Sequence, residues 1–218
     1  MSSFPRSPRL IKGALLSYEP MGFIPQVVIF QYNPEEMTRT LEAQRTQGTG
    51  DTAEVQRIKG PPVEIIKLKV EIDATDQLEK PEQNATTVTM GIYPQLSALE
   101  MMLYPKSSWV IAKTILANAG AIEIAPPEEP FTLFVWGIKR VVPVRIISFS
   151  IEEKFYDPNL NPIAAEVNLT LEVLTYEDFK FTHPGYAIFL AHQVVKETMA
   201  AVGSITNIAS SLGDVRIL

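Results

Sequence analysis

Hydrophobic and polar residues alternate along much of the chain, and this pattern predicts β-strands. The clearest case is the segment Val63–Asp73, in which apolar and charged residues take turns. Successive side chains of a strand point to opposite faces, so one face of this strand is expected to be buried and the other exposed. The apolar set is Ile66, Leu68, Val70 and Ile72, and the charged set is Lys67, Lys69, Glu71 and Asp73.

Six further stretches have the composition or the alternation of strands, namely residues 10–18, 25–32, 37–43, 131–136, 141–156 and 163–176. The last two are expected to form a hairpin, because residues 157–162 between them are dense in the turn formers Asp, Asn and Pro. In the first strand of this hairpin, one face is expected to carry Ile147, Phe149, Ile151 and Phe155. In the second, Val167, Leu169, Leu171 and Val173 are expected to face one way, and Glu166, Asn168, Thr170 and Glu172 the other.

Two segments show helical spacing instead. Apolar residues at Ile92, Leu96, Leu99 and Leu103 predict a helix over residues 88–104, ended by Pro105. A second helix is expected over residues 186–202, followed by a weaker amphipathic stretch over residues 205–212. Residues 76–87 are expected to form a polar loop, and residues 107–121 fit neither pattern. The chain is therefore predicted to be mainly β with some α structure, of the α+β class.

Composition narrows the range of functions. The chain has 218 residues and a net charge of -6, with its basic residues spread thinly, so no basic patch for nucleic acid is expected. Cysteine is absent, which excludes disulfides, thiolate metal sites and a cysteine nucleophile. The longest useful uncharged stretch, residues 198–213, is shorter than the roughly 20 apolar residues of a bilayer span. We expect neither a signal peptide nor membrane insertion.

The sequence offers no clear catalytic or metal-binding pattern. The two histidines, His183 and His192, are nine residues apart and would lie on roughly opposed faces of one helix. The adjacent acidic pairs, at residues 128–129 and 152–153, point to opposite faces if they lie in strands. No phosphate-binding loop, dinucleotide fingerprint or nucleophile elbow is present. We therefore expect a protein that is not an enzyme and needs no cofactor or metal.

Residues 44–60 are the most polar segment and contain few apolar side chains to bury. Long loops of this kind in compact domains are often functional, so the segment is a candidate contact loop. Its marker residues are Gln44, Gly48, Gly50, Asp51, Arg57 and Gly60.

Three short motifs occur in a fixed order along the chain. The first opens at Phe30 and continues through Tyr32, Asn33 and Pro34. The second contains Phe134, Trp136 and Gly137, in which Trp136 is expected to anchor the core while Gly137 permits close backbone approach. The third spans the expected hairpin and contains Phe155, Asp157, Pro158, Pro162 and Ala165.

In order and spacing, these motifs resemble the tube-adaptor family of contractile injection systems across roughly residues 9–177. Ala164 stands where the family commonly has an arginine, and the chain is too short for the peptidoglycan-binding-like LysM module that many members carry. The resemblance implies a tail-tube-like β-sandwich or barrel with a flanking helix over residues 1–177, and a C-terminal helical extension over residues 178–218.

The same resemblance implies a structural function. Six copies would close into a ring that joins the spike or hub protein to the inner tube protein and contacts baseplate wedge or sheath proteins. The hairpin of residues 141–176 would border the lumen, and the protein would be made in the cytoplasm and built into the particle. Two alternatives remain at this point: another tube-fold component of the same particle, such as a tube initiator or terminator, and a carbohydrate-binding β-sandwich.

Overall fold

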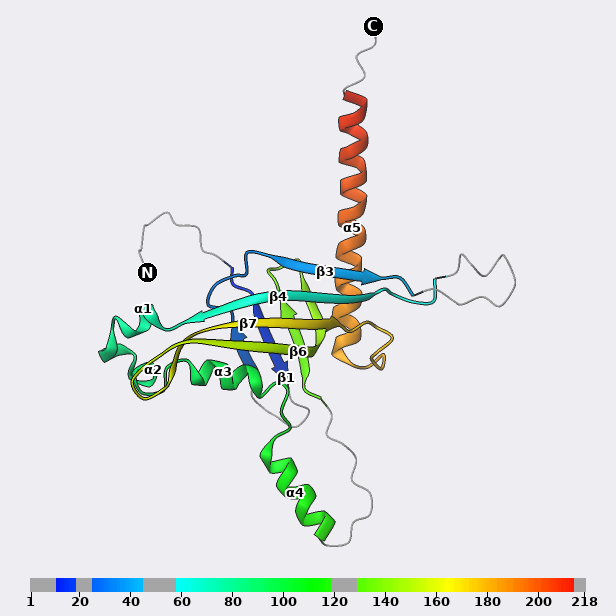
Figure 1. Cartoon of the computed structure of the whole chain (residues 1–218). Helices are drawn as coiled ribbons and strands as arrows, with labels where there is room; N and C mark the ends of the chain where they lie inside the picture. Colours follow the sequence, from blue (N-terminus) through cyan, green and yellow to red (C-terminus); the bar gives the residue numbers. More distant parts are fainter. Residues whose placement is uncertain (1–10, 19–24, 45–57, 119–128, 214–218) are drawn as a thin grey trace.

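The computed structural model describes residues 11–18, 25–44, 58–118 and 129–213. Its seven described strands form one antiparallel sheet in the order β2-β1-β5-β6-β7-β4-β3 (Figure 1). The α+β class predicted from the sequence is confirmed. The strands are β1 (Ala14–Tyr18), β2 (Gln26–Ile29), β3 (Met37–Glu42), β4 (Val63–Asp73), β5 (Phe131–Val135), β6 (Val141–Tyr156) and β7 (Pro162–Val173).

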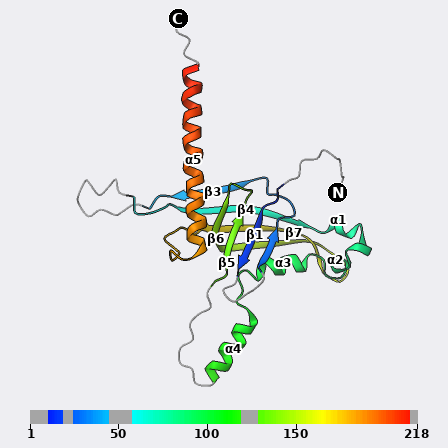
Figure 2. The same cartoon turned by 180° about the vertical axis from the view of Figure 1, so that it is seen from behind.

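The sheet folds across itself at β6, which is 16 residues long. Residues 141–144 of β6 pair with β5, whereas residues 144–156 pair with β7 on the other side. One half of the sheet therefore contains β2, β1 and β5, and the other contains β7, β4 and β3. The two halves cross in Figure 1 and in the reverse view of Figure 2. The sandwich implied by the resemblance is built from one continuous sheet, not from two separate sheets.

The hydrophobic core lies between the two halves. Leu15, Phe30 and Phe134 belong to the first half and join one buried cluster with the apolar faces of β4 and β7. The predicted burial of alternating residues in β4 and β7 is confirmed. The buried set is Ile66, Leu68, Val70, Ile72, Val167, Leu169, Leu171 and Val173.

The predicted face of β6 is wrong at its two ends. Ile147 is 49% exposed and Phe155 is 73% exposed, whereas Phe149 and Ile151 pack against the core. The register of β6 against β7 shifts between Ile146 and Ser148. A bulge adds one residue to a strand and reverses which side chains point inward, so Val142, Val144 and Ile146 precede the bulge on the core side instead.

The segment between β4 and β5 is more helical than predicted. It contains α1 (Thr75–Leu78), η1 (Pro81–Gln83), α2 (Ala85–Met90), α3 (Tyr93–Glu100) and α4 (Ser107–Asn118). Residues 76–87 are thus not a polar loop, and the helix expected over residues 88–104 is broken at Gly91. Gly91 has φ 58° and ψ -135°, a conformation that only glycine adopts readily, and it lets Ile92 donate its N–H to the carbonyl of Pro162 at 2.9 Å.

Substitution of Gly91 by alanine is expected to lower the free energy of unfolding by more than about 1 kcal/mol. An added Cβ would lie 2.2 Å from the Pro162 carbonyl oxygen and would be strained at positive φ. Gly203→Ala is the matched control, since Gly203 lies in a helix and no atom lies within 4 Å of the position that an added Cβ would take. Chemical denaturation should show a lower free energy of unfolding for Gly91→Ala and no loss for Gly203→Ala.

Two helices extend away from the folded sheet. The last helix, α5 (Pro184–Gly213), docks through Gly185, Phe189 and His192 and then continues past the body of the molecule as one element, where a second, weaker stretch was expected. Helix α4 points away from the opposite side of the body (Figure 1). Among the described residues, no helix is both long enough and apolar enough to cross a membrane.

Candidate assembly interface

The first two motifs meet in the core of the first half of the sheet. The ring centroids of Phe30 and Phe134 are 6.5 Å apart, and Phe134 stacks on Trp136 at 5.9 Å. Trp136 packs against the core as expected. Gly137 has φ 72° and no atom within 4 Å of a Cβ position, so it is required for the turn and not for the close approach predicted from the sequence.

The polar residues of the first motif tie neighbouring segments together. Asn33 accepts the N–H of Gly13 at 2.8 Å through Oδ1 and donates Nδ2 to the carbonyl of Ile11 at 2.9 Å. Gln31 binds the backbone N–H and C=O of Asp73, at the end of β4, in the same two-way manner. Side-chain amides here replace the ladder of a strand, which accounts for the Asn and Gln in this motif. Tyr32 remains 45% exposed.

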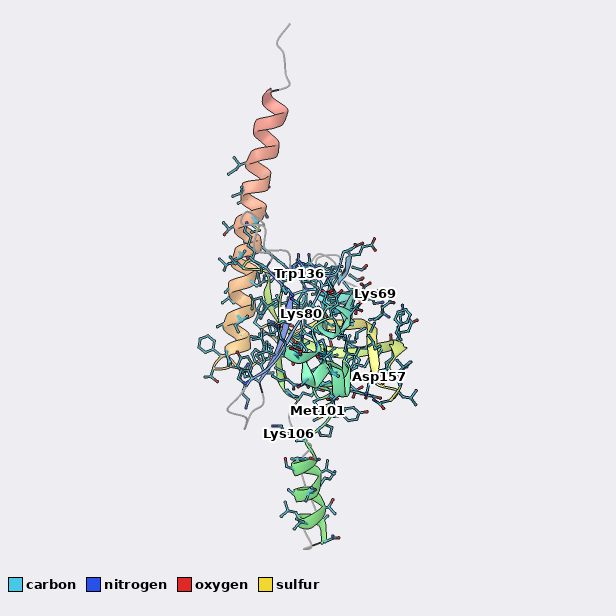
Figure 3. The ribbon with its side chains drawn as sticks, turned by 90° about the vertical axis from the view of Figure 1, so that its left-hand side faces the viewer. Lys69, Lys80, Met101, Lys106, Trp136 and Asp157 are labelled. Atoms are coloured by element: carbon cyan, nitrogen blue, oxygen red, sulfur yellow. The ribbon has the colours of Figure 1, made fainter. Side chains whose placement is uncertain are left out.

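The third motif forms the tip of the β6–β7 hairpin, as predicted. The Asp157 carboxylate accepts the backbone N–H groups of Asn159 and Asn161 at 2.7 and 2.8 Å. The side-chain hydrogen bond from Asn161, followed by these backbone bonds, lowers the pKa of Asp157. Ala165 is buried and pairs with Ile72 in β4. This tip is distant from the aromatic cluster, and Figure 3 places Asp157 and Trp136 in separate parts of the molecule.

The candidate contact loop is described only at its ends. Lys59 donates its N–H to the carbonyl of Gln44 at 3.0 Å, which closes the base of the connection between β3 and β4. Gly60 lies against the Glu177 carboxylate, 2.3 Å from where a Cβ would stand. The remaining marker residues, Gly48, Gly50, Asp51 and Arg57, lie outside the described residues, so the role of the loop stays a prediction.

The outer face of β6, β7 and β4 is charged but balanced, and we call it the polar face. Lys69 binds Glu166 at 2.6 Å, and Lys154 binds the same carboxylate at 2.5 Å. Strand register places four cations and five carboxylates on this face. They are Lys67, Lys69, Arg145 and Lys154, and Glu71, Asp73, Glu152, Glu166 and Glu172. Neither sign dominates, and none of Glu166, Asn168, Thr170 and Glu172 is in the buried core.

The half of the sheet that carries the polar face has two open edges. No described strand pairs with β3 on the side away from β4. Residues 145–156 of β6 likewise pair with β7 alone in the described part of the chain. Both edges expose main-chain N–H and C=O groups, which folded proteins usually cover or pair with another strand.

A buried ionic cluster, which the sequence reading missed, joins α5 to the sheet. Glu64 of β4 is 6% exposed and lies 2.6 Å from Arg39 of β3 and 3.2 Å from Lys196 of α5. Burial alone would raise the pKa of Glu64, but Arg39 and Lys196 together hold the pKa below its ordinary value. Glu64 lies on the same buried face of β4 as Ile66 and Leu68. An acidic residue at a position where the alternation calls for an apolar one is the feature of the sequence that could have indicated the cluster.

His192 lies in the same region and is 8% exposed. Burial, followed by the charge of Lys196, lowers the pKa of its imidazole below the ordinary value. Glu64 and the Lys139 backbone oppose this shift, while the charge of Arg140 adds to it. His183 instead caps the start of α5, where its Nδ1 accepts the N–H of Gly185 at 3.0 Å. The two histidines therefore lie in different surroundings.

The hollow beside the first motif gives little sign of substrate chemistry. It has a volume of about 700 Å³ and is lined by Tyr32, Asn33 and Pro34 together with charged residues of both signs. Within the described ranges, no three His, Asp or Glu side chains are grouped closely enough to hold a metal ion.

No protein-family model matches the chain. No curated protein matches it at a significant level.

Proposed function

We propose that this protein is a structural adaptor of a contractile injection system, which forms a ring between the spike or hub protein and the inner tube. The resemblance of the three motifs to the tube-adaptor family supports this proposal. The observation that carries the proposal in the structure is the pair of open edges on the half-sheet of β6, β7, β4 and β3. Its chemistry is assembly, with no reaction turned over.

The number of strands makes closure of such a ring simple. The four strands alternate in direction, so β3 runs opposite to β6. When copies are related by rotation about one axis, β3 of one copy meets β6 of the next in antiparallel orientation, and the alternation continues around the ring. A closed ring removes both edges from solvent in every copy. The polar face would then line the lumen, and its balanced charges would give a passing cargo no strong site of either sign.

The ring can be tested by mass and by blocking an edge. We expect the full chain to form a hexamer, six copies of 24.3 kDa or about 146 kDa, by light scattering and negative-stain imaging. Proline removes a backbone N–H, and adjacent residues of an edge strand donate alternately inward and outward. Thr40→Pro and Leu41→Pro should therefore differ. The variant that removes the N–H facing β4 should weaken the β3–β4 pair. The variant that removes the N–H at the open edge should fold normally but stay monomeric.

The adaptor role has its own readout. The assembled ring, added to the inner tube protein of the same particle, should shorten the lag before tubes form, whereas the monomeric proline variant should not. Assembly of both proline variants into rings, or a monomeric wild-type chain, would contradict the proposal. A ring that leaves tube formation unchanged would favour a different position in the particle, such as a terminator.

A further inference from the structure

Beyond Phe189 and His192, α5 stays attached to the sheet through the ion pair of Lys196 with Glu64, and its described side chains are otherwise turned to solvent. From Val194 to Ile205 every side chain is exposed, while the docked residues Gly185, Phe189 and His192 all lie earlier. Val194 is 52% exposed and Ile205 is 67% exposed. With Leu190 and Ala201 they lie along one stripe, because residues at these spacings share a helix face. Glu197 lies on the same stripe, and a monomer would leave the four apolar side chains around it in water.

Helix α4 also exposes apolar side chains to water, on the other side of the molecule. None of its residues is buried, and Ile111, Ile115 and Leu116 are 50–62% exposed. Its only charged residue is Lys113, which lies 5.2 Å from the centroid of the Trp109 ring. After Lys196, the only charged residue of α5 is Glu197. The two exposed helices are therefore both apolar and carry single charges of opposite sign.

The directions of the two helices decide what can cover them. In Figure 1, α5 passes the β3 edge and extends beyond it, and α4 extends beyond the side of the body that carries β6. Figure 3 shows again that they leave the body in opposite directions. They cannot cover each other within one subunit. A second copy that joins its β6 edge to β3, however, brings its α4 toward this α5.

We propose that the exposed stripe of α5, from Leu190 to Ile205, packs against α4 of the neighbouring copy. The inference rests on the proposed ring, whose β3-to-β6 contact sets the order of the copies. The contact is head-to-tail, using two different surfaces of the same chain, which is the arrangement that closes rings. It covers apolar side chains of both exposed helices with one interface.

Cysteine cross-linking of the full chain tests this contact directly, since the natural sequence has no cysteine. The double variant Ile115→Cys/Ile205→Cys, treated with a mild oxidant, is expected to give a ladder of covalent species from dimer to hexamer. Each single variant should give nothing larger than a dimer. Ile115→Cys/Gly203→Cys is the matched control, because Gly203 lies on the opposite face of the helix from the stripe, and we expect it to lose the species above dimer.

The outcomes separate this inference from the ring itself. A ring that forms without the 115–205 ladder overturns the α4–α5 contact and assigns α5 to another occupant, such as a baseplate protein, while the proposed function stands. A chain that remains monomeric overturns both. A ladder that persists in both proline variants of β3 supports the helix contact and contradicts the strand pairing.

Discussion

Phe134→Ala is expected to lower the free energy of unfolding by about 3–5 kcal/mol, the usual cost of removing a fully buried Phe. The Phe134 side chain is 0% exposed, stacks on Trp136 and contacts the ring of Phe30. Its removal leaves a cavity where the first two motifs meet, and rigid strands on both sides limit how far the core can collapse. Urea denaturation followed by circular dichroism measures the loss.

Phe155→Ala is the matched control, since it removes the same side chain from another motif. Phe155 is 73% exposed, so its loss should change stability by less than about 0.5 kcal/mol. If Phe155 belongs to a contact between copies, the same substitution should instead reduce ring formation. Equal stability losses in the two variants would contradict the distinction between a core motif and a surface motif.

The strands with strict alternation were predictable because burial on one face leaves a direct pattern in the sequence. In β4 and β7 that pattern gave both the strand and the buried face. In β6 it failed at Ile147, because a bulge depends on how the strand must bend between the two halves of the sheet. No local pattern of apolar and polar residues predicts that bend.

The helical region shows a similar limit. The spacing from Ile92 to Leu103 indicated a helix, but it could not show that Gly91 would turn the chain to reach Pro162, 71 positions later in sequence. Contacts of this kind depend on tertiary structure. Helix α4 was ambiguous for another reason: its apolar residues lie on all sides, so no periodic stripe separates helix from strand.

The sequence predicted some residues of the candidate assembly interface but not its open strand edges or its ionic cluster. Of the motif residues, Phe30 and Phe134 join one buried cluster, and Asn33 and Asp157 make hydrogen bonds within the chain. The open edges were not visible in the sequence, because strand order across a sheet is set by long-range pairing. The ionic cluster around Glu64 was also missed, since Arg39 and Lys196 are distant from Glu64 along the chain.

Removing both cationic partners of Glu64 is expected to destabilise the fold by about 2–3 kcal/mol at neutral pH. A buried charge left without a partner costs about 3–5 kcal/mol, and the value is reduced here because water reaches the partly exposed Lys196. The variant Arg39→Met/Lys196→Met keeps the apolar stems of both side chains and removes their charges. Adding Glu64→Gln should recover most of the loss, because no buried charge then remains.

The pH dependence of stability provides the sharper test of this cluster. In the natural chain the pKa values of Glu64 and His192 are both lowered, so the unfolded chain binds more protons, and stability falls with acidification below about pH 6.5 for His192 and below about pH 4.5 for Glu64. Without Arg39 and Lys196, burial should raise the pKa of Glu64. The folded variant then binds a proton that the unfolded chain does not, so acidification favours folding. The amount by which the variant is less stable than the natural chain should therefore shrink as the pH falls from 7 toward 4. Thermal unfolding across this range measures the difference, and a deficit that stays constant with pH would show that Glu64 is not the group left unpaired.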